Sequence, residues 1–263
     1  MLYIITRREQ YLKLKLEVMK KSFAFIYGLF AYLIFLIAFL YAIGFVGNFI
    51  VPKSIDSGTE TNFWQALLVN ALVLSLFVIQ HSIMARPAFK KWFTSIISPA
   101  IERSTFVLLT SLILLLIFWQ WQPLTAIVWK AENETVAIIL TGVFFFGWLV
   151  VFLSTFMINH FELFGLKQIF DNLKSKQPQP HVLQVNFFYK IVRHPIMLGF
   201  IIAFWATPLM TVGHLIFSIA TTIYIVVAVK FLEEKDLRNY IGKEYEKYQK
   251  KVPMLIPFMK SGK

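Results

Sequence analysis

The sequence predicts an all-α integral membrane protein with about five to six transmembrane segments, a C-terminal helix hairpin and a cytoplasmic C-terminal helix. Of its 263 residues, 58% are hydrophobic and only 15% are charged, whereas soluble domains carry about a quarter charged residues. The mean hydropathy is +0.66. Long uncharged runs recur along the chain, and no linker or internal repeat divides it. We therefore expect a single helical domain over residues 1–263.

Four uncharged runs are each long enough, or nearly so, to form a membrane-spanning helix: Phe23–Val46, Phe63–Ile79, Thr105–Trp121 and Val136–Ile158. A hydrocarbon core of about 30 Å requires roughly 20 apolar residues in a helix. The first run is longer than the roughly 7–15 residues of the apolar region in a cleaved signal peptide, so it is expected to remain as a helix. The basic segment before it, residues 1–22, is predicted to be an interfacial helix, with disorder as the alternative.

The last apolar run, Pro195–Val229, is predicted to fold back on itself as a hairpin. As one helix it would be about 50 Å long, which exceeds the thickness of the bilayer core. Pro208 lies inside the run, and proline removes a helical hydrogen bond and clashes with the preceding turn. The expected arms are Pro195–Thr207 and Val212–Val229. Because the first arm is short, a turn within the membrane is an alternative to a complete crossing.

The distribution of basic residues supports this hairpin. With it, 24 of the 26 Lys and Arg residues lie on one side of the membrane, and only Lys53 and Lys130 lie on the other. The positive-inside rule makes the basic side cytoplasmic, together with both termini. The net charge of +12 is then explained by contact with anionic lipid headgroups, and no nucleic acid is needed. No obligate protein partner is evident. The absence of cysteine excludes disulfides, thiolate nucleophiles and cysteine metal sites.

Two polar segments on the cytoplasmic side are expected to close over the helix ends as a lid. The loop 161–192 contains prolines at 178 and 180 and is predicted to be an exposed turn. The tail from Lys230 is predicted to continue as a helix to about Gln249. Pro253 and Pro257 then favour an extended end.

The hairpin is flanked by charged groups that would meet at the cytoplasmic face. Arg193-His194-Pro195 precedes it and Glu233-Glu234 follows it. Either group alone is explained by ordinary helix-end chemistry, since proline favours the first helical position and glutamates pair with nearby basic residues. Together they could bind a zwitterion: the helix N-terminus and the arginine would bind a carboxylate, and the glutamates would bind an ammonium or sulfonium group.

Other candidate residues are tyrosines and histidines. The tyrosines Tyr189, Tyr245 and Tyr248 are either interfacial aromatics or an adenine-stacking wall. The five histidines, at 81, 160, 181, 194 and 214, lie mostly at predicted helix ends. Their spacing contains no His-x-x-x-His pair and no associated carboxylates, so no metal site is predicted.

The C-terminal motifs resemble those of the isoprenylcysteine carboxyl methyltransferase-like membrane enzymes. The matching pattern runs from Arg193-His194-Pro195-x-x-x-Gly199-Phe200 through Glu233-Glu234 and Gly242-x-x-Tyr245-x-x-Tyr248 to Val252-Pro253-x-x-Ile256-Pro257. Met197 and Met254 stand where the prenylcysteine enzymes favour Tyr and Arg, which argues against a prenylcysteine substrate. The chain also lacks a G-x-G-x-x-G loop. The resemblance implies that S-adenosylmethionine binds without a Rossmann domain, in the C-terminal part 186–258.

The whole chain is more similar to the methanethiol S-methyltransferases, a branch related to the NnrU proteins. The resembling segments are Gln80-His81-Ser82-x-Met84-Ala85-Arg86, Glu102-Arg103-Ser104-Thr105, Trp119-Gln120-Trp121-x-Pro123, Asn159-His160-Phe161-x-Leu163-Phe164-Gly165-Leu166 and Arg193-His194-Pro195-x-Met197-x-Gly199-Phe200. This branch implies methyl transfer from S-adenosylmethionine to methanethiol, a small volatile thiol, giving dimethyl sulfide at a bacterial inner membrane.

The resemblance also assigns roles to residues. The expected cofactor-binding residues are Tyr189, Arg193, His194, Pro195, Glu233, Glu234 and Tyr245. The thiolate is the nucleophile, so a base is wanted, and His160 or His81 is the candidate. Arg86 is a candidate thiolate stabiliser because it stays protonated.

Specificity would come from a small apolar pocket whose residues the sequence does not identify. The alternatives are a methyltransferase of the same fold that acts on hydrogen sulfide, another thiol, a lipid or a prenylcysteine, and a non-catalytic NnrU-like membrane protein. A transporter is disfavoured because the predicted spans hold no ionisable residues near the membrane centre.

Overall fold

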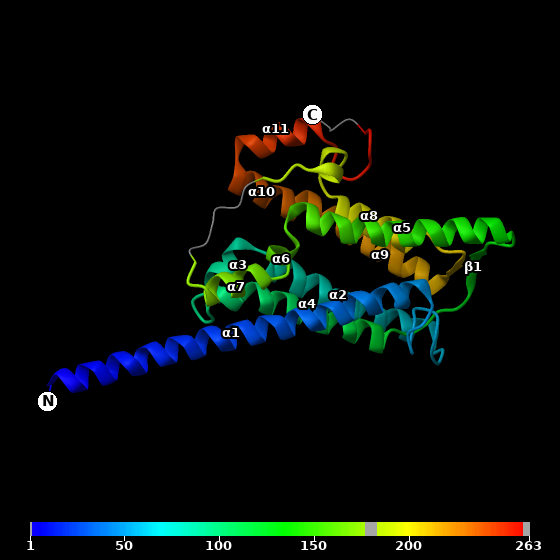
Figure 1. Cartoon of the computed structure of the whole chain (residues 1–263). Coiled ribbons are helices and arrows are strands. Elements are labelled where there is room, and N and C mark those ends of the chain that lie inside the picture. Colours follow the sequence, from blue (N-terminus) through cyan, green and yellow to red (C-terminus); the bar gives the residue numbers. More distant parts are fainter. Residues whose placement is uncertain (1, 177–182, 260–263) are drawn as a thin grey trace.

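The structure is a computed structural model that describes residues 2–176 and 183–259 (Figure 1). Its longer helices are α1 (Leu2–Gly47), α2 (Phe63–Met84), α4 (Pro99–Gln120), α5 (Glu134–Ile158), α8 (Pro195–Trp205) and α9 (Val212–Val227). Among the described residues, five helices are long and apolar enough to cross a membrane, and the last continues from Val212 to Ile241. The predicted all-α membrane fold is therefore confirmed.

The remaining elements are short and lie between or after these helices. They are the helices α3 (Pro87–Phe93), α6 (His160–Leu163), α7 (Leu166–Leu173), α10 (Glu234–Ile241) and α11 (Lys243–Lys251), the 3-10 helix η1 (Phe187–Lys190), the π-helix η2 (Ala228–Glu233), and the strands β1 (Ile127–Lys130) and β2 (Leu209–Thr211). The loop 161–192 thus contains α6, α7 and η1 as well as exposed chain. His181 lies outside the described residues.

The helix α1 is longer than the predicted span because the basic segment continues it without a break. Its 46 residues correspond to about 69 Å at 1.5 Å per residue, more than twice a bilayer core. Its first half extends beyond the rest of the bundle (Figure 1). The basic segment is helical in its described part and continues directly into the apolar run.

Local sequence sets where the next helices begin. The helices α2, α4, α5 and α9 each start at a side chain that accepts a hydrogen bond from a backbone N–H two or three residues later, at Asn62, Ser98, Asn133 and Thr211. Such caps satisfy N–H groups that the helix itself leaves without a partner. In α4 and α8 a proline occupies the first helical position, where its missing N–H has no cost.

The predicted hairpin is formed by α8 and α9, and its turn contains the strand β2. Ile127 of β1 pairs with Thr211 of β2, and the Ala131 amide donates to the Pro208 carbonyl over 2.8 Å. The turn therefore lies against the loop that joins α4 to α5. This contact shows that the turn of the hairpin reaches the level of that loop, although α8, with 11 residues, is shorter than the helices that are long enough to cross a membrane.

The helix α8 packs closely on α5 because two glycines face each other. A Cβ atom added to Gly147 would lie 2.6 Å from the Ala203 backbone nitrogen, and one added to Gly199 would lie 2.7 Å from the Gly147 carbonyl oxygen. Small residues of this kind allow membrane helices to approach closely. Since His194 immediately precedes α8, this packing fixes the position of the polar motif at its start.

Contacts between distant segments define two ends of the bundle. At one end, called the basic end, Lys21 donates to Ser175, Arg103 donates to the Leu163 carbonyl, and Arg86 pairs with Asp236. At the opposite end, Asp56 accepts from Thr211. The predicted gathering of the 85–104 and 160–195 loops on one side is confirmed by these contacts.

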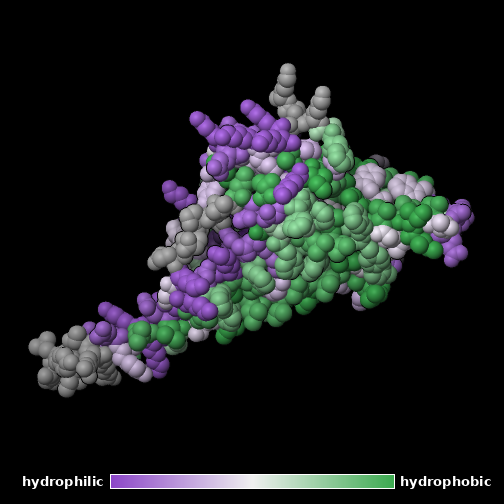
Figure 2. All heavy atoms as spheres, turned by 45° about the horizontal axis from the view of Figure 1, so that its top comes forward, coloured by the Kyte–Doolittle hydropathy of each residue, from purple (hydrophilic) through white to green (hydrophobic). Residues whose placement is uncertain are grey.

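Apolar side chains fill the interior and also cover the outside. A buried aromatic cluster surrounds Trp121 and includes Phe45, Phe118 and Phe217. Large apolar residues on the outer helix faces are exposed, among them Leu40 at 64%. Figure 2 shows a broad hydrophobic body with hydrophilic residues gathered over the basic end. An exposed apolar surface on such long helices is suited to lipid contact.

Candidate functional site: a buried ionic network at the basic end

The start of α8 and the C-terminal tail form one structural unit. The Arg193 amide donates to the Pro253 carbonyl over 2.9 Å, and the His194 amide donates to the Met254 carbonyl over 3.2 Å. The tail reaches this position because its helix breaks into α10 and α11 at Gly242, whose φ is +71°. The tail is helical as far as Lys251, close to the expected Gln249, but it bends at Gly242, which was not expected. Glycine adopts positive φ without a steric penalty, which permits the bend.

Arg193 fastens the tail from inside the protein. Its side chain is buried, and its Nε donates to Glu234 Oε1 over 2.6 Å. Its Nη1 donates to the Gln249 carbonyl over 3.1 Å and also to the Val252 carbonyl. Carbonyls at the end of a helix have no partner within the helix, so this guanidinium completes the end of α11. Arg193 therefore joins the hairpin, α10 and the tail.

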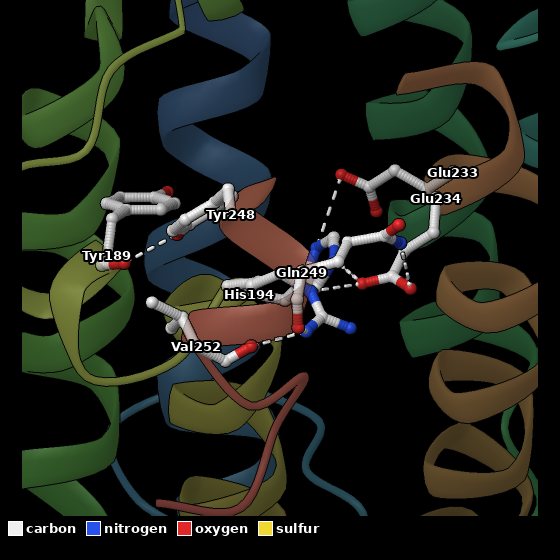
Figure 3. A network of polar contacts seen from close by, with 8 residues as sticks. Tyr189, His194, Glu233, Glu234, Tyr248, Gln249 and Val252 are labelled. Carbon is white, nitrogen blue, oxygen red and sulfur yellow. Dashed lines mark hydrogen bonds and ion pairs between the residues drawn. The ribbon is translucent and has the colours of Figure 1, made fainter. Parts of the chain in front are cut away.

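The two adjacent glutamates have different environments. Glu234 is buried, with Oε1 accepting from Arg193 and from His194 Nε2 at 3.2 Å, and with Oε2 accepting from Gln249 Nε2 at 2.9 Å (Figure 3). The side chain of Glu233 is 44% exposed, and its Oε1 lies 3.5 Å from His194 Nδ1. Glu234 is thus bound on both oxygens, whereas Glu233 retains a face that a ligand can reach.

His194 lies between these two carboxylates. Burial lowers its pKa, but the carboxylates of Glu233 and Glu234 outweigh burial and raise the pKa to about 9. The imidazole is therefore positively charged at neutral pH, and both ring N–H groups donate. Pro195, which follows it, is buried at the first position of α8.

The two glutamates lie where a π-helical turn passes into α10. The helix α9 widens into η2 over Ala228–Glu233 before α10 begins at Glu234. In a regular α-helix, consecutive side chains point about 100° apart. π-helical turns are rare and occur often at functional sites. No residue pattern in this segment indicated the wider turn, so sequence reasoning missed it.

The three predicted tyrosines gather beside the network. The rings of Tyr245 and Tyr248 have centroids 5.8 Å apart. The Tyr248 hydroxyl donates to the Tyr189 carbonyl (Figure 3). All three are buried, and burial raises the pKa of each hydroxyl. The Tyr245 hydroxyl is buried without a hydrogen-bond partner in the described structure, and it is within electrostatic range of Glu234.

His160, a predicted candidate base, has both ring nitrogens occupied. Its Nε2 lies 2.7 Å from the Tyr32 hydroxyl and its Nδ1 lies 2.8 Å from the Thr155 hydroxyl. The ring also stacks on Phe156 at 4.2 Å. Burial lowers its pKa. These contacts join α6 to α1 and α5, so the residue has a packing role that the sequence did not reveal.

His81, the other candidate, lies near the end of α2 with a free ring nitrogen. Its Nδ1 is buried and has no hydrogen-bond partner among the described residues. The ring interacts electrostatically with Glu233. Arg86, the predicted thiolate stabiliser, donates to Asp236 at 2.8 Å and to the Ser82 carbonyl at 3.1 Å. Arg86 therefore holds α10 against the end of α2.

Two further residues belong to this end but were given no role by the sequence. Gln249 binds Glu234, and its spacing of four residues from Tyr245 places both on one helix face. Arg103 donates to the Leu163 carbonyl at 2.7 Å and interacts electrostatically with Glu233. The described residues contain no group of three or more His, Cys, Asp or Glu side chains arranged to hold a metal ion.

Comparison with known proteins identifies the family. Residues 68–258 match the model of the NnrU protein family. The methanethiol S-methyltransferase 1 of Bradyrhizobium diazoefficiens is 53% identical over 92% of this chain and 84% of its own length. The methanethiol S-methyltransferases of Mycobacterium tuberculosis and Crocosphaera subtropica are 48% and 46% identical, over 91% and 92% of this chain and 98% and 94% of their own lengths.

No solved structure matches the chain. The family match covers most of the sequence, including every residue of the ionic network. The named relatives extend the similarity to nearly the whole chain. This chain therefore belongs to the NnrU family, in the branch of the methanethiol S-methyltransferases.

Proposed function

We propose that this chain transfers the methyl group of S-adenosylmethionine to methanethiol and so forms dimethyl sulfide. The named relatives, at 46–53% identity, carry the methanethiol assignment. The single structural observation that supports it is the meeting of Arg193, His194, Glu233 and Glu234 at the basic end. That meeting supplies a charged site at the end of an otherwise apolar bundle.

The residues at this end fit a zwitterionic cofactor that carries a sulfonium charge. The partly exposed Glu233 carboxylate suits a cationic group of the ligand. The unpartnered Tyr245 hydroxyl can donate to a ligand oxygen or accept from a ligand amine. When bound, S-adenosylmethionine supplies an activated methyl group, and the protein contributes positioning. Tyr189 and Tyr248 form the aromatic side of the proposed site.

Arg193, Glu234 and Pro195 support the site from behind in this proposal. Arg193 and Glu234 bind each other and the tail, so they hold Glu233, His194 and Tyr245 in place. This differs from a direct contact between Arg193 and a cofactor carboxylate. Loss of either partner would then weaken cofactor binding indirectly, through the position of the tail.

The membrane setting follows from the same structure. We place the basic end at the cytoplasmic face of a bacterial inner membrane, with both termini cytoplasmic. Lys and Arg residues at that end would contact anionic lipids, and the exposed apolar faces would contact acyl chains. A small apolar thiol dissolves in lipid, so it could reach the bundle laterally.

The direct test uses purified protein in detergent, supplied with S-adenosylmethionine and methanethiol. We expect dimethyl sulfide in the headspace and S-adenosylhomocysteine in solution in equal amounts. Calorimetric binding of S-adenosylhomocysteine should accompany the activity. Cofactor binding without turnover of methanethiol would reject this substrate but keep the methyltransferase assignment, and a panel of hydrogen sulfide, larger thiols and prenylcysteine would then identify the acceptor. Absence of binding would reject both.

A further inference from the structure

We propose that the methyl-accepting thiol binds beside His81, between α2, α4 and α9, and that Nδ1 of His81 takes the thiol proton. This inference rests on the proposed function and specifies the acceptor side of the same site. It selects one of the two histidines that the sequence left open. It also identifies the apolar pocket that the sequence could not.

The first argument is the free nitrogen. Polar atoms in protein interiors are normally hydrogen-bonded, yet Nδ1 of His81 is buried without a partner in the part of the chain that the structure describes. His160 and His194 each have contacts at both ring nitrogens. His214 lies at the opposite end, where its Nε2 contacts the Phe204 carbonyl. Among these four histidines, His81 therefore has the buried nitrogen that a ligand could use.

The second argument is the apolar surroundings of the ring. Phe77 stacks on the imidazole with centroids 5.2 Å apart and an interplanar angle of 14°. Phe106 lies at 5.1 Å and Tyr224 at 6.5 Å. These rings come from three helices and enclose the histidine at the end of the bundle. Apolar rings of this kind provide the contacts that a thiol of two heavy atoms can make.

The third argument is the position of Glu233 between the two sides of the site. Its carboxylate contacts His194 in the ionic network and interacts electrostatically with His81. Arg86 and Arg103 also act on His81. A proton on the His81 imidazole would be a third positive charge, in addition to those of Arg86 and Arg103, and the Glu233 carboxylate supplies a negative charge that offsets it. A cation held by Glu233 and a thiol beside His81 would therefore lie at the same end of the bundle.

The chemical step is balanced with these groups. The thiol S–H bond breaks and its proton moves to Nδ1 of His81. The thiolate sulfur forms a bond to the methyl carbon, and the bond from that carbon to the sulfonium sulfur breaks with its electron pair on the departing sulfur. Dimethyl sulfide and S-adenosylhomocysteine leave, and His81 returns its proton to water. No oxidant or metal takes part in this sequence.

The test replaces His81 with asparagine and compares two acceptors. Hydrogen sulfide is smaller and a stronger acid than methanethiol, so it needs less help from a base. We expect H81N to lower kcat with methanethiol by about a hundredfold or more, to lower kcat with hydrogen sulfide much less, and to bind S-adenosylhomocysteine normally. Its rate with methanethiol should rise with pH more steeply than that of the unmodified protein, because solvent must then ionise the thiol.

Equal losses with the two acceptors, or a pH profile that matches the unmodified protein, would overturn the role of His81. His160→Asn is the matched control, because it removes hydrogen bonds to Tyr32 and Thr155. It should reduce thermal stability and leave the ratio of rates with the two acceptors unchanged. If the unmodified protein methylates neither acceptor, the proposed function has failed and not merely the choice of base.

A second variant tests the pocket and applies even if H81N does not fold. Phe106→Leu shortens one wall while remaining apolar. We expect the kcat/KM for ethanethiol relative to methanethiol to rise about tenfold, since one methylene in an apolar pocket is worth about 10-fold or more in selectivity. An unchanged ratio would place the thiol elsewhere. Phe146→Leu, on an exposed face of α5, is the control and should leave the ratio unchanged.

Discussion

Replacing Glu234 and Glu233 by alanine, one at a time, should show that Glu234 stabilises the fold and that Glu233 binds the ligand. Glu234 is 7% exposed at its side chain and accepts hydrogen bonds from Arg193, His194 and Gln249. Its removal leaves two buried cations without their shared carboxylate. Breaking a buried ion pair in this way costs about 3–5 kcal/mol. For a chain of this size, the melting temperature should fall on the order of 10 °C.

Glu233→Ala should instead affect cofactor binding more than stability. Its side chain is 44% exposed and lies 3.5 Å from His194. Ion pairs with this much solvent contact contribute about 0–1 kcal/mol to stability. We therefore expect a smaller fall in melting temperature than for Glu234→Ala and a marked loss of affinity for S-adenosylmethionine. The two variants should therefore differ in melting temperature and in cofactor affinity, although the two residues are adjacent in the sequence.

The assay measures thermal unfolding in detergent by tryptophan fluorescence, and cofactor affinity by calorimetry. Glu246→Ala, at an exposed position of α11, is the control and should change neither quantity. If Glu233→Ala lowers the melting temperature as much as Glu234→Ala does, then Glu233 is also a structural residue. If it leaves cofactor affinity unchanged, the assignment of Glu233 to the ligand is incorrect.

Two further predictions concern packing and pH. Gly147→Ala should destabilise the protein by about 1–3 kcal/mol through overpacking, because the new methyl group would lie 2.6 Å from a backbone nitrogen of α8. Gly142→Ala, on the same helix with open space around it, is the control and should not destabilise the protein. Equal melting temperatures for the two variants would contradict the close contact. Although burial lowers its pKa, His194 has a folded-state pKa raised by its carboxylates to about 9, above about 6.5 for an unfolded chain. Its contribution to stability is therefore complete below about pH 6.5 and lost as the pH rises through about 9, so melting temperatures from pH 6 to 10 should fall for the unmodified protein and fall less for His194→Gln.

The meeting of Arg193 with Glu234 could be predicted because it depends only on topology. A hairpin that crosses the membrane and returns places both of its flanks on the same face, whatever the details of packing. The long apolar runs predicted five to six membrane segments, and the basic residues favoured the hairpin over one long helix. The distance of 2.6 Å between Arg193 Nε and Glu234 Oε1 confirms that the two flanks meet.

The roles of individual side chains could not be predicted in this way. The partner of His160 is Tyr32, 128 residues earlier in the chain, and no local pattern links the two. Arg193 binds tail carbonyls whose position depends on the bend at Gly242. The strands β1 and β2 are short and form only where the hairpin turn meets the preceding loop. Each of these features arises from tertiary contact and not from local preference.

The different environments of Glu233 and Glu234 also affect the release of the product cofactor. Glu234 is saturated by Arg193, His194 and Gln249, so its charge is balanced whether or not a ligand is present. Under the proposed assignment, Glu233 is the carboxylate whose balance changes during the reaction, because methyl transfer removes the positive charge of the sulfonium. The same carboxylate that attracts the charged cofactor then attracts the neutral thioether of the product less strongly. Holding one carboxylate rigidly inside the network and leaving its neighbour accessible thus favours release of the spent cofactor.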